Sequence, residues 1–279
     1  MKDEGQFKSA QMDLLYELHR ICQKHAIRYF LDAGTLIGAI RHDGFIPWDD
    51  DIDVGMLRQD YDRFIEACKE ELDPAYTLYD WHKDPYSPLP FLKLKINGTH
   101  YREEISAGSK MNDGIFIDIF PYDNAPDAPA ARKKQAWKLF WIRKILLLRC
   151  GFRLDGGSIA KKLIYGTLNL VSRVRSVAAW KKSCDRILIQ YRDADTTYVT
   201  NMCSAYKYEK MTFPREMLRE QILHRFETGM FCVPEQYDAA LRQVYGNYMQ
   251  LPPEEQRAGR HGVLHMDLGS YRIRAMQEN

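Results

Sequence analysis

Residues 29–56 read YFLDAGTLIGAIRHDGFIPWDDDIDVGM, which places an apolar run, a small-residue turn and a dense acidic run in close succession. Residues 28–32 are typical of a strand, and residues 36–41 are predicted to form a short helix after the turn at residues 33–35. A second strand is predicted over residues 51–56, where apolar residues alternate with other types. Two strands joined by a short helix therefore bring the acidic run to one end of a sheet.

The acidic run carries the strongest chemical signal. Residues two apart on a strand point to the same face, so Asp51 and Asp53 are predicted to lie together, with Ile52 and Val54 toward the core. Neighbouring carboxylates repel each other and resist desolvation, so such a pair is usually balanced by a cation. Hard oxygen ligands favour Mg²⁺ or Mn²⁺. The competing interpretation is a solvent-facing acidic loop or a helix cap.

A third acid, Asp118, lies within the apolar run GIFIDIF of residues 114–120. The run is predicted to be a strand over residues 115–120, with Gly114 and Pro121 at its ends. A carboxylate without a partner among Ile and Phe side chains would be expensive to ionise. Asp118 is therefore predicted to contact a metal ion or to form a salt bridge with a Lys or Arg from elsewhere.

The rest of the chain predicts a mixed fold. Helical periodicity is seen over residues 9–26, 58–72, 131–150, 159–180 and 234–245, and strand character over residues 76–79, 91–96 and 226–233. Helices and strands alternate irregularly, which predicts an α+β domain with a small mixed sheet backed by helices. The six cysteines lack the spacing of a zinc site and are predicted to be buried free thiols.

The central segment has a different composition. Residues 132–182 contain fourteen Lys or Arg and one acid, Asp155, for a net charge of +13, whereas the whole chain has a net charge of +2. Two helices are predicted there, separated by Gly151 and the pair Gly156-Gly157. Their basic and aromatic residues fit either an interfacial membrane contact or a solvated face of packed helices. The chain is therefore divided into a catalytic core (1–126), a basic helical insert (127–185) and a C-terminal part that completes the catalytic domain (186–279).

Charge and hydropathy narrow the classes of function. The small net charge argues against a dedicated nucleic-acid-binding protein. The N-terminus is polar where a signal peptide would be apolar, and no apolar run approaches the roughly 20 residues that span a bilayer. We therefore expect a cytoplasmic protein, with the inner face of the cell membrane as a candidate location for the basic segment.

Three motifs resemble those of a known family. Residues 29–56 resemble the signature of the LicD family, which comprises bacterial phosphocholine transferases of the nucleotidyltransferase superfamily, related to fukutin-type ribitol-phosphate transferases. The runs FIDIFP (116–121) and YGNYMQLPP (245–253) resemble further motifs of the family. Together the motifs span most of the chain, and the basic segment matches least well.

The resemblance implies a nucleotidyltransferase-like core. In that superfamily a Gly-Ser or Gly-Thr turn precedes an Asp-x-Asp pair, and a later strand supplies a third Asp. Gly34 with Thr35, Asp51 with Asp53, and Asp118 match these places. Thr35 stands where many relatives have Ser, and its hydroxyl keeps the phosphate contact possible. The resemblance thus implies two Mg²⁺ or Mn²⁺ ions held by the three aspartates, suited to an in-line displacement.

Other side chains are candidates for binding the donor. The Gly34 and Thr35 amides are expected to hold donor phosphates at a helix N-terminus. Arg41 is a candidate phosphate clamp, or else forms a surface ion pair with a nearby acid. Asp49 is expected near the donor. Lys93 shares a strand face with Lys95 and is expected either to reach phosphate or to be solvated.

Two further groups of side chains have weaker claims. A cation–π cage for choline could be formed by Trp48, Trp81 and Tyr122, although core packing is the ordinary role of such residues. His261 and His265 could assist the leaving group or the acceptor, although a polar tail often carries histidines without a catalytic role.

The resemblance implies transfer of a phospho-alcohol from a CDP-alcohol, foremost phosphocholine from CDP-choline, to a sugar hydroxyl of a cell-surface glycan or its lipid-linked precursor, with release of CMP. Three alternative functions are open, of which some use the same acids and one uses none of them. They are a nucleotidyltransferase that modifies a small hydroxylated substrate, a non-catalytic membrane-associated glycan-binding protein, and a glycosyltransferase that uses an Asp-x-Asp motif. The last would be expected to begin with a nucleotide-binding βαβ unit, which the sequence lacks.

Overall fold

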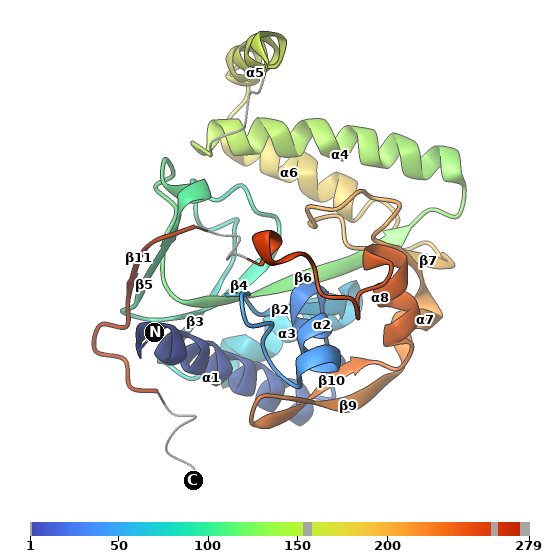
Figure 1. Cartoon of the computed structure of the whole chain (residues 1–279). Helices are drawn as coiled ribbons and strands as arrows, with labels where there is room; N and C mark the ends of the chain where they lie inside the picture. Colours follow the sequence, from blue (N-terminus) through green and yellow to red (C-terminus); the bar gives the residue numbers. More distant parts are fainter. Residues whose placement is uncertain (1, 153–157, 258–261, 274–279) are drawn as a thin grey trace.

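The computed structural model describes residues 2–152, 158–257 and 262–273 (Figure 1). The helices are α1 (Lys2–Lys24), α2 (Ala33–His42), α3 (Arg58–Glu71), α4 (Pro129–Arg149), α5 (Ile159–Ser172), α6 (Val177–Leu188), α7 (Arg215–Arg219) and α8 (Tyr237–Tyr245). The strands are β1 (Phe30–Leu31), β2 (Asp53–Leu57), β3 (Tyr76–Tyr79), β4 (Leu92–Ile96), β5 (His100–Glu103), β6 (Phe116–Ala125), β7 (Tyr198–Thr200), β8 (Thr212–Pro214), β9 (Gln221–Phe226), β10 (Gly229–Pro234) and β11 (Val263–Asp267). The predicted α+β class is confirmed.

A mixed sheet of seven strands forms the centre of the molecule. Its order is β1-β2-β6-β4-β3, and β7 and β8 extend it beyond the second half of β6. The β2 and β6 strands run parallel, while all other neighbours in this sheet are antiparallel. Because β2 and β6 lie side by side, the acidic run before β2 and the apolar run of β6 meet although they are far apart in the sequence.

Strand β6 is longer than predicted. It continues through Pro121 to Ala125, so the prediction that Pro121 ends this strand is wrong. The antiparallel pairing with β4 reaches Ile119, and the pairing with β7 begins at Asp123. Pro121 therefore lies where β6 passes from one antiparallel partner to the other, at a position where its missing N–H group is tolerated.

The two faces of the central sheet are covered by different elements. One core cluster joins the apolar face of α1, including Leu14 and Leu18, to Ile52 and Val54 of the β2 region and to Ile117 of β6. A second face is covered by the C-terminal part of the chain, where Phe30 and Tyr122 pack with residues of β8, α7 and α8. Asp53 and Asp118 therefore lie on neighbouring strands, β2 and β6, of a sheet that is packed from both sides.

The basic segment forms three helices rather than two. Helices α4 and α6 pack against each other in a layer beside the sheet, and α5 projects from one end of that layer (Figure 1). The predicted single helix over residues 159–180 is wrong, because α5 ends at Ser172 and α6 begins at Val177. The Ser176 hydroxyl accepts a hydrogen bond from the Ala179 amide and caps the new helix. The predicted break at Gly156-Gly157 lies outside the described residues.

The C-terminal part contains two features that were not predicted. The predicted strand over residues 226–233 covers the turn and most of the second strand of a hairpin, whose first strand, β9, was not predicted. In this hairpin β9 and β10 pair from Phe226 with Gly229 to Gln221 with Pro234. Its turn includes Glu227 at a φ of 53°. Strand β11 lies in the polar C-terminal tail, for which no strand was predicted, and it pairs with β5.

The cysteines and helices agree with two simpler predictions. All six cysteines are free, and all except the partly exposed Cys232 are buried. Among the described residues, no helix is both long and apolar enough to cross a bilayer.

Candidate active site

The acidic run converges at the start of β2. One carboxylate oxygen from each of Asp49, Asp50 and Asp51 lies within 4.8 Å of the others. Strand β2 begins at Asp53, so the three preceding acids lie on irregular backbone rather than on the strand predicted from Asp51 onward. A loop lacks the two-residue alternation of a strand, and consecutive carboxylates can therefore face the same point. Such a set of oxygen atoms can hold a hard divalent cation.

Asp53 and Asp118 are brought together by the parallel pairing of β2 and β6, in which they are register partners. Ile52 and Val54 are fully buried on the core side, as predicted. Burial raises the pKa of Asp53 well above its usual value, and the charges of Asp51 and Asp118 raise the pKa further. The site is therefore a concentration of negative charge that a cation would stabilise.

Lys93 already supplies one positive charge to this site. Its Nζ atom lies 2.6 Å from Oδ1 of Asp118, and both side chains are largely buried. The same ammonium group lies 3.3 Å from the centroid of the Phe116 ring. Lys93 and Lys95 are each 4% exposed, so the interpretation of a solvated strand face is wrong. The salt bridge expected as one alternative for Asp118 is present.

Lys95 makes a different contact from Lys93. Its Nζ atom donates a hydrogen bond to the carbonyl of Asn112 and lies 3.9 Å from the centroid of the Tyr79 ring. Burial, and then the charge of Lys93, lower the pKa of Lys95 to about 7. Only Lys93 of the two is paired with a carboxylate of the site.

Helix α2 fixes the acidic run from the other side. It begins at Ala33, so Gly34 and Thr35 belong to its first turn rather than to a turn before it. A Cβ atom on Gly34 would lie 2.4 Å from Oδ2 of Asp49, so the absence of a side chain allows Asp49 to approach the helix. The Thr35 hydroxyl accepts a hydrogen bond of 2.8 Å from the Asp53 amide. Gly34 and Thr35 thus position two of the acids.

The N-cap of α2 is an acid that the sequence did not single out. Asp32 accepts hydrogen bonds from the Ala33 amide and from the Tyr122 hydroxyl, at 2.8 Å in each case. Burial raises its pKa, although these hydrogen bonds oppose the rise. Its charge in turn contributes to the raised pKa of Asp53. An Asp before a predicted helix is an ordinary cap signal, and this signal could have identified Asp32.

Segments from the C-terminal part hold the loop that leads into the acidic run. Nη1 of Arg41 donates a hydrogen bond of 2.5 Å to the Tyr248 carbonyl, which belongs to the motif over residues 245–253. The Glu227 carboxylate accepts a hydrogen bond from the Phe45 amide. Burial lowers the pKa of Arg41, and so does the charge of Arg257. Among the described residues Arg41 has no acid within ion-pair distance, so a surface ion pair does not explain it.

The aromatic residues proposed as a choline cage do not form one. Trp48 packs at the edge of the main core, Trp81 is buried beside α4 and α6, and Tyr122 is buried in a third cluster. His265 is on β11, with its ring centroid 6.3 Å from that of His100. His261 lies outside the described residues.

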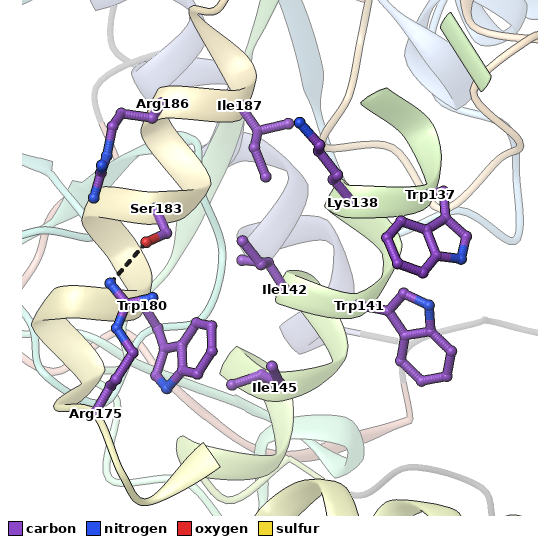
Figure 2. Close-up of a pocket in the computed structure, with 10 residues that line it drawn as sticks. All are labelled: Trp137, Lys138, Trp141, Ile142, Ile145, Arg175, Trp180, Ser183, Arg186 and Ile187. Atoms are coloured by element: carbon purple, nitrogen blue, oxygen red, sulfur yellow. Dashed lines mark hydrogen bonds between the residues drawn. The ribbon is translucent and has the colours of Figure 1, made fainter. Parts of the chain in front are cut away.

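A sizeable cavity lies away from the acids. It has a volume of about 590 Å³, lies between α4 and α6, and contains none of the aspartates (Figure 2). Its size does not make it the reaction site, because no carboxylate or nucleophilic pair lines it. The acids before β2 remain the candidate active site.

Comparison with known proteins identifies the family of the chain. The family model described as LicD/FKTN/FKRP, nucleotidyltransferase domain, matches residues 26–144, which include Asp32, the acids at residues 49–53 and Asp118. The lipopolysaccharide cholinephosphotransferase LicD of Haemophilus influenzae is 32% identical over 257 residues, covering 90% of this chain and 92% of that protein. The mouse ribitol 5-phosphate transferase FKRP is 42% identical over 104 residues, covering 37% of this chain and 18% of that protein. Because the likeness to the bacterial protein extends over nearly the whole of both chains, the protein belongs to the LicD family.

Proposed function

We propose that the protein transfers a phospho-alcohol group from a CDP-alcohol to a sugar hydroxyl of a cell-surface glycan or its lipid-linked precursor, with release of CMP. CDP-choline is the leading candidate donor, because the relative that is matched over 92% of its length is a cholinephosphotransferase. The observation that carries the proposal is the meeting of Asp53 and Asp118 beside the converging carboxylates of Asp49, Asp50 and Asp51.

The donor set fits Mg²⁺ or Mn²⁺. Asp51, Asp53 and Asp118 are proposed to hold two such ions, with Asp49 and Asp50 close enough to Asp51 to act as ligands or to orient it. Metal ions of this kind neutralise phosphate charge and make an acceptor hydroxyl more acidic. The raised pKa of Asp53 supports this assignment, because a cation favours the ionised carboxylate.

The donor phosphates are proposed to lie against the first turn of α2. The amides of Gly34 and Thr35 belong to that turn, where N–H groups are left without a helical acceptor. The Thr35 hydroxyl already accepts a hydrogen bond from the Asp53 amide, and its own proton stays available for a phosphate oxygen. Arg41 is proposed as a cationic group at the other end of the same helix, with its remaining N–H groups directed to the donor.

Lys93 is proposed to have two roles, one toward Asp118 and one toward the donor phosphates. It stabilises Asp118 as long as the ion pair persists, and its ammonium group adds positive charge next to the phosphates. Asp118 is then proposed to orient the acceptor hydroxyl or to accept its proton. The hydrogen bond from Lys93 to Oδ1 of Asp118 holds this carboxylate in a fixed position for that role.

The division of the chain is proposed on the same basis. Residues 1–126 and 186–279 would form one nucleotidyltransferase-like catalytic domain, because β7 and β8 join the central sheet through β6. Residues 127–185 would be the basic helical insert. A lipid-linked acceptor would bring this insert to the inner face of the cell membrane, and no nucleic acid is proposed as a partner.

Release of CMP tests the proposal. The purified protein is incubated with CDP-choline, CDP-ethanolamine, CDP-glycerol, CDP-ribitol, CTP, ATP and UDP-sugars, each with Mg²⁺ or Mn²⁺ and with chelator. We expect metal-dependent release of CMP from one CDP-alcohol. Turnover of a nucleoside triphosphate alone would replace the proposal with nucleotidyl transfer.

Substitutions then locate the reaction. Asp51→Asn and Asp53→Asn should each abolish turnover while the circular dichroism spectrum stays unchanged. Asp195→Asn is a matched control, because this exposed acid lies outside the site. Activity that survives either site substitution would refute the metal assignment.

A further inference from the structure

A groove between α4 and α6 has the chemistry of a lipid site. Its walls are apolar and aromatic, and the larger side chains that form them are Trp137, Trp141, Ile142, Ile145, Trp180 and Ile187 (Figure 2). Its volume of about 590 Å³ is within the ordinary range for ligand sites. Figure 2 shows Ile142, Ile145 and Trp180 between the two helices, so they line the interior.

The charged groups of the groove are all basic. Lys138, Arg175 and Arg186 line it, and no carboxylate does. Nη2 of Arg175 donates hydrogen bonds to the Ala179 carbonyl and to the Ser183 hydroxyl, and its guanidinium lies 4.6 Å from the centroid of the Trp180 ring. A positive group held in place beside an apolar wall is suited to a ligand with an anionic head and an apolar chain.

The groove opens within an exposed apolar and basic surface. Trp137 is 65% exposed and Phe140 is 51% exposed on α4. On the adjoining α5 and the turn that follows it, the large apolar side chains more than half exposed are Ile159, Leu163, Ile164, Leu170, Val171 and Val174. Lys144 links the two helices, because its ammonium group lies within 6 Å of the Phe140 and Tyr165 rings. Apolar surface of this extent marks an interaction site, and the surrounding positive charge matches a phosphate-bearing lipid.

We propose that this groove binds the apolar chain of a phosphate-bearing lipid, with the phosphate at Arg175 and Arg186. Lipid binding itself does not depend on the proposed function. Only the identification of this lipid as the carrier of the sugar acceptor rests on that function. A lipid-linked glycan has a chain and sugars that can occupy separate sites, so the separation of this groove from the aspartates is consistent with one acceptor. The groove would then select acceptors by their carrier, whereas the acids carry out the transfer.

Binding can be measured without turnover, because three of the five tryptophans line the groove. Farnesyl phosphate is titrated into the wild-type protein below its micellar concentration, and tryptophan fluorescence is recorded. Farnesol and inorganic phosphate test the two halves of the ligand separately. We expect saturable binding of farnesyl phosphate, at least 10-fold weaker binding of farnesol, and no response to inorganic phosphate. Binding of lysophosphatidic acid that exceeds that of farnesyl phosphate would assign the groove to a bilayer lipid rather than to a prenyl carrier.

Variants locate the site of binding. Ile142→Glu places a charge in the groove and should weaken binding at least 10-fold, and Arg186→Gln should weaken it about 3-fold or more. Ser183→Leu narrows the groove without adding charge, and it replaces Ile142→Glu if that variant is misfolded by circular dichroism. Leu223→Ser is the matched control, since it removes an exposed apolar side chain of β9 outside the groove and should leave the Kd unchanged. Leu163→Ser tests the exposed apolar surface of α5 separately.

Two results would overturn the proposal. One is unchanged binding in folded Ile142→Glu and Ser183→Leu, and the other is loss of binding in Leu163→Ser alone, which would place the lipid on α5. A wild-type protein that binds farnesyl phosphate but releases no CMP from any donor would refute the proposed transfer and leave the groove assignment standing. A protein that releases CMP but does not bind the probe would refute the groove assignment alone.

Discussion

Replacing Lys93 with methionine tests whether the acidic site depends on this built-in cation. Methionine keeps much of the apolar stem that packs near Phe116 but removes the charge 2.6 Å from Asp118. Asp118 would then lie beside Asp53 without its lysine partner. Removal of one partner of a buried ion pair typically costs about 3–5 kcal/mol. The Asp118 side chain retains 14% exposure, so we expect the lower end, about 3 kcal/mol.

The free energy of unfolding is measured in urea at pH 8 with chelator present. A loss of about 3 kcal/mol corresponds to a fall in Tm of roughly 6–12 °C for a protein of this size. Mn²⁺ should then restore more stability to Lys93→Met than to the wild type, because the ion replaces the lost positive charge. At a concentration 100 times its Kd, a bound ion contributes about 2.7 kcal/mol.

Two further variants complete the experiment. Lys95→Met removes an equally buried lysine whose partner is a carbonyl, so it should cost less, and Mn²⁺ should not change the difference from the wild type. Lys93→Met combined with Asp118→Asn should be at least as stable as Asp118→Asn alone, because in the single variant Lys93 keeps its buried charge without its carboxylate partner. The reasoning is refuted if Lys93→Met unfolds like the wild type without metal, or if its cost persists unchanged in the Asp118→Asn background.

Three further results are expected. Gly34→Ala should lower activity or metal affinity about 10- to 100-fold with little change in Tm, because the added Cβ atom displaces only the Asp49 carboxylate; unchanged kinetics would show that Asp49 is dispensable. Gly55→Ala should lower the free energy of unfolding by about 1–3 kcal/mol, because its Cβ atom would lie 2.3 Å from the Phe30 ring, and an unchanged urea midpoint would contradict this. The pKa of Lys95 is lowered from 10.5 to about 7, so the unfolded chain binds more protons between these values and Lys95 should make stability rise with pH there. Lys95→Met should flatten that rise in urea unfolding at pH 7, 8.5 and 10, and an equal rise in both proteins would show that other groups cause it.

The acidic run and its neighbours were the most predictable part of the fold. Residues 29–56 combine strand alternation with apolar residues at helical spacing, and the structure contains the two strands and the helix between them. The predicted turn at residues 33–35 is instead the first turn of α2. The alternation also placed Ile52 and Val54 correctly in the core. The start of β2 was less predictable, because the same charged residues can continue a strand or precede it.

Most contacts between distant segments could not be predicted from the sequence. Strand alternation placed Lys93 and Lys95 on one face, but only the pairing of β4 with β6 reveals that this face is buried against Asp118. The β9–β10 turn lacks the usual glycine at its left-handed residue, which is Glu227, so the turn resembled part of a strand and β9 was not predicted. The roles of the site residues and the three-part division of the chain stay predictions.

The hydrogen bonds from Arg41 to Tyr248 and from Phe45 to Glu227 have a consequence for synthesis of the chain. The segment between these two donors leads directly into the acidic run. The ribosome must therefore synthesise the chain as far as Tyr248 before both hydrogen bonds to this segment can form. Nascent chains that already contain every aspartate of the site would still lack its final geometry, so activity should appear only late in translation.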